Sequence, residues 1–176
     1  SFSVGKIIAS KAAPKLCPVT LELGGKNPNI IMSDADLEIA IPGVIDGMRY
    51  TRQGQACTAG SRVYIHEKIY DKVLDGAVKK LNKLKMGNAL DENSDIGAII
   101  SEEQLKRTLY YMDIAKKNPS TKILHGGNQS KGGEYKDGFY YEPTLLSGLP
   151  VSSPVCQEEV FGPVACAIPF KSFDEV

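Results

Sequence analysis

The chain has 176 residues, of which 42% are hydrophobic and 24% charged, as in an ordinary globular domain. Its 21 basic and 21 acidic side chains cancel, so no broad basic field attracts nucleic acid or an anionic membrane. No apolar run approaches the roughly 20 residues that a membrane-spanning helix needs. We therefore expect neither nucleic acid nor a membrane as a partner.

The cysteines and the two chain ends indicate the cellular compartment of the protein and whether the sequence is part of a longer chain. The four cysteines form no CxxC pair and the two histidines lie far apart, so we expect no metal site. The start shows no signal-peptide pattern, which with reduced thiols favours a cytoplasmic protein. The chain begins with the pattern of a first helical turn and stops where an apolar and acidic pattern begins another element, so both ends indicate a piece of a longer chain.

The first third of the chain predicts two helices and two strands. A helix is capped by Ser1 or Ser3, and a second begins at Ser33 or Asp34 and is bent or divided at Pro42. Alternating or continuous apolar runs indicate the strands. In chain order we expect a helix over 3–13, a strand over 17–23, a strand over 27–32 and a helix over 33–50.

The remainder alternates strands with helices. The elements expected there are a strand over 61–67, helices over 68–84 and 101–118, a strand over 121–127, an extended segment over 139–149 and a strand over 163–170. This alternation predicts an α/β fold, a layered and largely parallel sheet with flanking helices. The glycine-rich loop 126–138 lacks the order of a phosphate-binding loop and is interpreted as an exposed turn.

Cys57 is the first candidate for chemistry. It lies in "RQGQACTAGSR" (52–62), among the smallest side chains in the sequence. A nucleophilic thiol needs room for its substrate, and small neighbours let backbone N–H groups approach the reacting carbon. The expected position between a helix and a strand suits a reactive residue, although a buried, inert thiol is the alternative.

Two acidic motifs are further candidates. Glu22 lies in the apolar run "VTLELGG" just before two glycines, where a partly desolvated carboxylate can act as a general base. A solvent-facing acid at a strand end is the alternative. "QEEVFGPV" (157–164) holds two acids and an aromatic residue before a Gly-Pro turn, and plain turn chemistry is its alternative.

Taken in order, "LELGGKNP", "GQACTAGSR" and "EEVFGPV" resemble the NAD(P)-dependent aldehyde dehydrogenase superfamily over nearly the whole chain. The resemblance implies a Rossmann-like catalytic-domain fold, with Cys57 as the nucleophile and Glu22 as the base that activates a water. It also implies that Leu23, Gly24, Glu159 and Phe161 bind the nicotinamide end of NAD or NADP. Ser1 would lie at the helix N-terminus that receives the pyrophosphate.

The implied reaction oxidises a small-molecule aldehyde to a carboxylic acid through a thiohemiacetal and a thioester on Cys57. The Cys57 backbone N–H would supply one donor to the oxyanion. The resemblance further implies that the complete enzyme is a homo-dimer or homo-tetramer.

The resemblance also divides the chain. Residues 1–24 would be the end of the cofactor-binding domain, and 25–176 a catalytic domain truncated at its C-terminus. The family's oxyanion-hole asparagine and adenosine-binding positions would lie upstream, so we expect the chain alone to be inactive.

The substrate and two rival functions stay open. Arg49 or Arg52, just before the nucleophile, would favour an acidic aldehyde, unless both form structural ion pairs. A CoA-dependent acylating enzyme is one rival, although that branch commonly lacks a base such as Glu22. A non-catalytic binding paralogue is the other, and it would be expected to lose Cys57 or Glu22.

Overall fold

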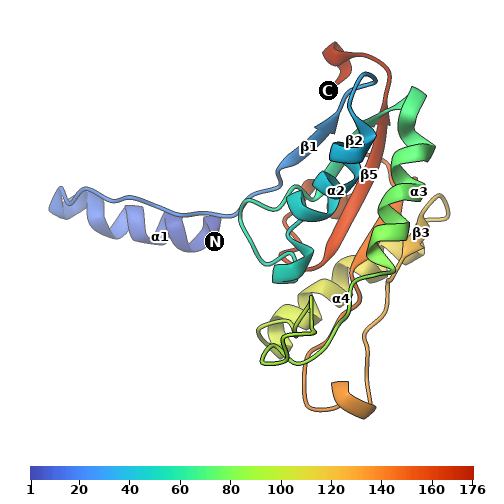
Figure 1. Ribbon diagram of the computed structural model, residues 1–176. Helices are drawn as coiled ribbons and strands as arrows, with labels where there is room; N and C mark the ends of the chain where they lie inside the picture. The colour runs from blue at the N-terminus through green and yellow to red at the C-terminus, as the bar shows by residue number, and fades with distance from the viewer.

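The computed structural model describes all residues, 1–176, and its centre is one five-stranded sheet (Figure 1). The strands lie in the order β1 (Pro28–Ile31), β2 (Arg62–His66), β5 (Val164–Phe170), β4 (Thr144–Ser147) and β3 (Lys122–His125). The first four run parallel, and β3 pairs with β4 in the antiparallel sense at one edge. The expected α/β fold with a largely parallel sheet is confirmed.

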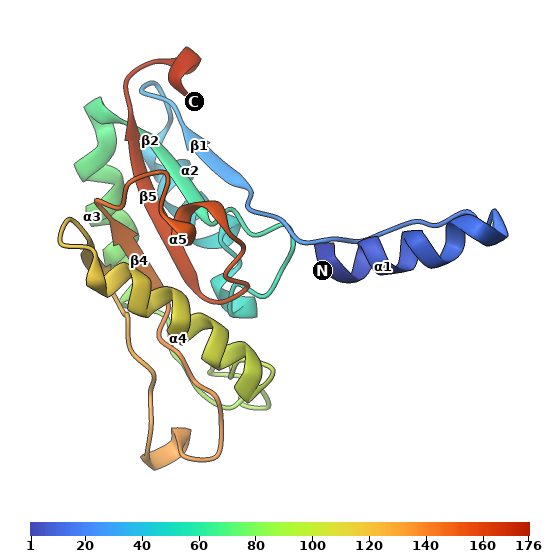
Figure 2. The ribbon, with the colours of Figure 1, turned by 180° about the vertical axis from the view of Figure 1, so that it is seen from behind.

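Helices cover both faces of the sheet. The helices on one face are α2 (Leu37–Gly47) and α3 (Tyr70–Leu81); those on the other are α4 (Glu102–Lys117) and the short α5 (Pro154–Gln157). The second pair is in front when the molecule is seen from behind (Figure 2). Ser101 caps α4, its hydroxyl accepting a bond from the Gln104 N–H at 3.2 Å, so the predicted start of this helix is confirmed.

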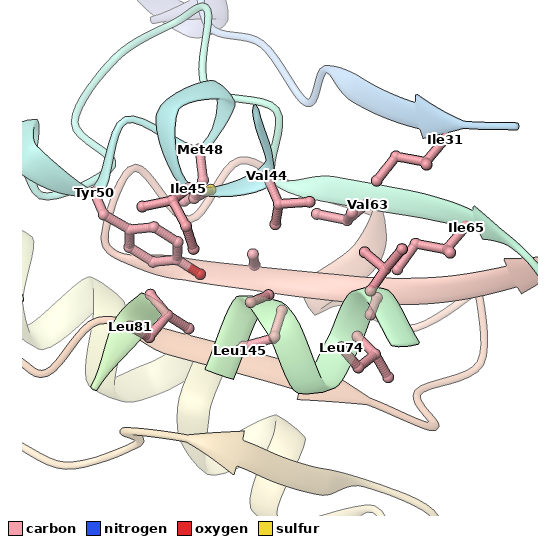
Figure 3. Close-up of a cluster of buried hydrophobic side chains, with 14 of the residues drawn as sticks. Ile31, Val44, Ile45, Met48, Tyr50, Val63, Ile65, Leu74, Leu81 and Leu145 are labelled. Atoms are coloured by element: carbon pink, nitrogen blue, oxygen red, sulfur yellow. The ribbon is translucent and has the colours of Figure 1, made fainter. Parts of the chain in front are cut away.

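The two faces carry separate cores because strand side chains alternate between them. Leu145 of β4 packs toward α2 and α3, whereas its neighbour Leu146 packs toward α4 and α5. Figure 3 shows the first core, where Val63 and Ile65 of β2 lie between the two helices. The strand side chains named here are buried, and they lie on both faces of the sheet, as expected for a parallel sheet between helix layers.

The N-terminal helix α1 (Phe2–Ala12) stands apart from this body. It projects from the sheet on an extended connection, as both ribbon views show (Figures 1 and 2). Ser1 caps it, since its hydroxyl accepts a bond from the Val4 N–H at 3.4 Å. Several of its apolar side chains are exposed, namely Phe2, Val4, Ile7 and Ile8.

Two predictions in the first third were wrong. Residues 17–23 form no strand, because alternation makes a strand only where a neighbouring chain supplies hydrogen bonds, and the first paired residue is Pro28. The second helix begins later than expected, capped by Asp36, and Pro42 does not divide it. Its apolar side, including Val44 and Ile45, is held in the first core, which offsets the hydrogen bond that proline omits.

Candidate active site

The three sequence motifs meet at one edge of the sheet. Glu22 precedes β1, Cys57 precedes β2 and Glu159 precedes β5, and these strands are parallel neighbours. The amino ends of parallel neighbours lie at the same edge, so segments far apart in sequence come together. The site therefore lies at the amino ends of the strands, rather than at the carboxyl ends where open α/β sheets commonly bind ligands.

The Cys57 loop is a series of tight turns between α2 and β2. A 3₁₀ turn over Tyr50–Arg52 is flanked by Arg49 and Gln53, both left-handed with φ of 58° and 54°. The Gly60 N–H donates to the Gly47 carbonyl at 2.8 Å and closes the loop onto the end of α2. The exposed Cys57 thiol therefore sits on a short, braced connection.

Small residues are required here by close backbone contacts. Gly54 has φ of +62°, and a Cβ on it would collide with the Gly162 carbonyl before β5. A Cβ on Gly25 would collide with the Cys57 carbonyl. The motif before β1 thus lies directly against the Cys57 loop, and neither position has space for a larger residue.

Glu159 is held by the glycine pair. Its Oε1 accepts a bond from the Gly25 N–H at 2.9 Å, while Oε2 accepts none within the chain. A Cβ on Gly24 would collide with the Glu159 carboxylate. The Arg107 guanidinium donates to the Glu159 main-chain carbonyl at 2.6 Å, so this residue is fixed through both side chain and backbone.

A cleft of about 670 Å³ joins these groups. The seven residues singled out from the sequence all line it, namely Ser1, Glu22, Leu23, Gly24, Cys57, Glu159 and Phe161. A second cleft, of about 660 Å³, continues past Ser1, Gly24 and Glu159 along the start of α1. The structure thus brings together every residue predicted for the site.

Glu22 lies on the extended segment before β1, not on a strand, and its side chain is exposed. The expected partial burial inside a strand is therefore not found within this chain. Its place in the cleft nevertheless sets it on the same wall as Leu23 and Gly24.

The sequence analysis missed the contribution of α4. Glu103, Gln104 and Arg107 from this helix also line the cleft. The Gln104 amide donates to the carbonyls of Val160 at 3.0 Å and Phe161 at 2.8 Å, which supports the left-handed Phe161 (φ 56°). The only signal was their spacing of three and four residues, which places them on one helix face. An ordinary solvent-exposed helix face shows the same spacing, so the spacing does not distinguish these residues.

The arginines before Cys57 do not form the expected ion pairs. Arg49 and Arg52 are exposed, and the two salt bridges of the chain lie within α4, Lys106–Glu102 and Lys117–Asp113. Neither arginine lines the cleft. The structural alternative for these residues is wrong, and their effect on substrate choice stays a prediction.

The half-buried Lys26, which lines the second cleft, places its buried ammonium near two buried thiols, Cys156 and Cys166. Burial lowers the pKa of Lys26, and no group accepts a hydrogen bond from its ammonium. A bond from the Cys166 thiol, followed by the positive charge of Lys26, lowers the pKa of Cys156. The same bond and burial raise the pKa of Cys166. Lys26 directly follows Gly25, whose N–H bonds the Glu159 carboxylate, so this cluster adjoins the Glu159 contact in the chain.

No three His, Cys, Asp or Glu side chains are grouped so that they could hold a metal ion. None of the helices has the length and apolar content needed to cross a membrane.

Comparison with known proteins identifies relatives over the whole chain. The profile of the aldehyde dehydrogenase family matches residues 1–176. The D-glyceraldehyde dehydrogenase (NADP(+)) of Picrophilus torridus is 39% identical over 177 residues, and the 3,6-anhydro-alpha-L-galactose dehydrogenase of Vibrio sp. (strain EJY3) is 37% identical over 176. Each alignment covers 100% of this chain, but only 35% and 36% of the relative.

The fold agrees with solved structures of the same kind. The NAD+ complex of an aldehyde dehydrogenase from Bacillus cereus superposes with a TM-score of 0.92 at 39% identity, covering 99% of this chain and 34% of that one. The chain thus spans about a third of the length of its relatives. With three ordered motifs in one cleft and a family match from end to end, this chain belongs to the aldehyde dehydrogenase family.

Proposed function

We propose that this chain is part of an NAD(P)+-dependent enzyme that oxidises an aldehyde to a carboxylic acid through intermediates bound to Cys57. The observation that carries the proposal is the shared cleft, which holds an exposed thiol, a carboxylate and the Glu159 segment. The family membership supports the same reaction class.

In the proposed mechanism the Cys57 thiolate attacks the aldehyde carbon and forms a C–S bond, which gives a thiohemiacetal oxyanion. The Cys57 backbone N–H donates to no other group in the chain, so it is free to bond this oxygen. After oxidation to the thioester, Glu22 takes a proton from a water as that water attacks the carbonyl. The C–S bond then breaks, releasing the acid and the thiolate.

The residues of the cleft suit a nicotinamide dinucleotide, NAD or NADP. The unbonded Oε2 of Glu159 offers an acceptor for ribose hydroxyls, and Phe161, Leu23 and Gly24 flank the same space. Ser1, at the start of the eleven-residue α1, suits the pyrophosphate. Arg107 is the one cation of this cleft. Bound there, the nicotinamide would supply the hydride acceptor needed to oxidise the thiohemiacetal to the thioester.

We also propose a division of the chain. Residues 1–24, with the projecting α1, would be the end of the cofactor-binding domain, and 25–176 most of the catalytic domain. The exposed apolar side chains of α1 and the coverage of about a third of the relatives support this. The proposal extends to a cytoplasmic location, because chemistry on Cys57 needs a reduced thiol. It also includes the homo-dimer or homo-tetramer that the resemblance implies.

The test uses the complete polypeptide that contains this chain. NAD(P)H formation is measured over a panel of neutral and acidic aldehydes, for the wild type and for Cys57→Ser. We expect Cys57→Ser to lose activity by a factor of about 10³ or more, since it removes the nucleophile. Cys17→Ser, at an exposed thiol outside the cleft, is the matched control and keeps wild-type rates.

Each other outcome has a distinct meaning. Turnover by Cys57→Ser at the wild-type rate would contradict the proposed nucleophile. Turnover that requires added CoA would identify the acylating alternative, and a folded enzyme without activity on any aldehyde would identify the binding paralogue. The ranking of neutral against acidic aldehydes tests the expectation for Arg49 and Arg52.

A further inference from the structure

Asn27 connects the nucleophile loop to the segment that carries the base. Its side-chain amide donates to the Cys57 carbonyl at 2.5 Å and lies 3.4 Å from the Ala59 carbonyl. Its main-chain carbonyl accepts a bond from the Arg62 N–H at 3.3 Å. One residue therefore holds both the reactive residue of the loop and the first residue of β2.

The loop has little else to hold it at this point. The N–H groups of Cys57 and Thr58 donate to no main-chain or side-chain acceptor, and the turn is closed only by the Ala59 N–H, which donates to the Ala56 carbonyl at 3.0 Å. The Asn27 bond fixes the direction of the Cys57 carbonyl and hence the rotation of the backbone about Cys57. That rotation also sets where its thiol and its N–H point.

The same segment fixes the position of the base. Asn27 lies five residues after Glu22 on one continuous extended stretch, and Gly25 between them is in contact with the Cys57 carbonyl. The amide orientation is determined by its partners, because carbonyl oxygens only accept hydrogen bonds. An aspartate in its place would set a carboxylate against two carbonyl oxygens and push the two segments apart.

We propose that Asn27 is a positioning residue for the reaction: its amide holds the Cys57 loop in register with the Glu22 segment. The inference rests on the proposed role of Cys57 as nucleophile. It assigns to Asn27 no contact with substrate or cofactor, since this residue lines neither of the two clefts.

The experiment compares Asn27→Asp and Asn27→Ala with Asn29→Asp in the complete enzyme. Asn29 is a matched control, because it lies two residues further along the chain, in β1, and its amide also donates to a carbonyl, that of Gly43 at 3.3 Å. We expect both Asn27 variants to lower kcat by about 10- to 100-fold with little change in KM for the aldehyde. Asn29→Asp should change kcat by less than about 3-fold.

A second measurement separates positioning from general loss of structure. Alkylation by iodoacetamide is followed by mass spectrometry at Cys57 and, in the same sample, at the exposed Cys17. The Asn27 variants should change the Cys57 rate by about 5-fold or more and leave the Cys17 rate unchanged. If Asn27→Asp does not fold, the kcat and the Cys57 alkylation rate of Asn27→Ala, which adds no charge, test the proposal.

The two proposals can fail separately. Full activity of Cys57→Ser would remove the proposed nucleophile, whatever the Asn27 variants do. If Cys57→Ser is inactive while Asn27→Ala keeps the wild-type kcat and Cys57 alkylation rate, the positioning role is overturned. Equal losses in Asn27→Asp and Asn29→Asp would also overturn it.

Discussion

At the scale of single residues, the candidate site depends on glycines, which have no side chain, as much as on the side chains that line it. Gly24 has no Cβ, and this lets the Glu159 carboxylate lie against the backbone and bond to the Gly25 N–H. An added methyl group would force the carboxylate to move, because the methyl and Oε2 would occupy the same space.

The first prediction concerns Gly24→Ala in the complete enzyme. Displacement of Glu159 should raise KM for NAD(P)+ by about 10-fold with a smaller effect on kcat, as for a loss of uniform binding. Steady-state kinetics with varied cofactor checks this. Gly43→Ala is the control, since its Cβ would meet nothing within 4 Å in the middle of α2. Equal KM values for Gly24→Ala and the wild type would show that Glu159 does not contact the cofactor.

The second prediction concerns Lys26→Met and pH. Burial lowers the pKa of Lys26 below the ordinary value of 10.5, so the unfolded chain binds more protons between the two values. Stability from this group therefore rises as pH increases through that window, and at lower pH the buried charge is unfavourable. Lys26→Met should raise the free energy of unfolding by about 1 kcal/mol at neutral pH.

Denaturant unfolding of this chain at neutral pH and at pH 10 measures the difference. The gain from Lys26→Met should shrink at the higher pH, because a lysine with a lowered pKa carries less of its charge there. Lys72→Met, at an exposed position on α3, should show no such pH dependence. A gain that grows with pH would contradict the lowered pKa.

At the scale of elements, strand β2 is the centre of the molecule. It pairs with β1 on one side and β5 on the other, and the Cys57 loop leads directly into it. Ile65 is 0% exposed and packs in the first core between α2 and α3 (Figure 3).

The third prediction is that Ile65→Ala lowers the free energy of unfolding of this chain by about 3 kcal/mol, through lost burial and a residual cavity. Chemical denaturation followed by circular dichroism measures it. Ile39→Ala on α2 removes the same atoms from a side chain that is 72% exposed and should cost less than about 0.5 kcal/mol. Similar losses in both variants would mean that the first core is not packed as described.

Elements with a strong local signal could be predicted, and those that depend on distant partners could not. The helix α3 follows from its apolar spacing, which places Val73, Leu74 and Leu81 on one buried side. Residues 17–23 show an equally clear alternation of apolar and polar side chains, but no neighbouring strand pairs with them. The hydrogen bond from Asn27 to Cys57 joins residues 30 positions apart, and no local sequence pattern predicts such a contact.

At the scale of the whole molecule, the proposed cofactor site is shared between the sheet edge and α1. Near the start of the helix, Ser1, Phe2 and Ser3 border the second cleft, and a Cβ on Gly5 would collide with Leu23 of the extended connection. The three motifs that line the first cleft could be found from the sequence, because each is a short run of unusual residues. The α4 residues that complete it could not, because a charged helix face is common.

The fourth prediction is that this chain alone binds NAD+ weakly. Most of a dinucleotide would extend beyond Glu159 and Ser1 to surfaces proposed to lie outside these residues. Calorimetric titration should show no saturable heat below about 1 mM NAD+. The complete polypeptide, titrated in parallel, should bind in the micromolar range. Micromolar binding to residues 1–176 would refute the proposed division.

The position of the three motifs ahead of neighbouring strands has a consequence for chain length. A strand advances about 3.3 Å per residue, so one residue inserted between Glu22 and Pro28 would shift the proposed base against Cys57 by about that much. The loop 126–138 joins β3 to β4 and borders neither cleft. We therefore expect insertions to be tolerated in that loop and harmful ahead of β1, β2 and β5. Length variation in functional relatives should be confined to turns remote from the amino edge of the sheet.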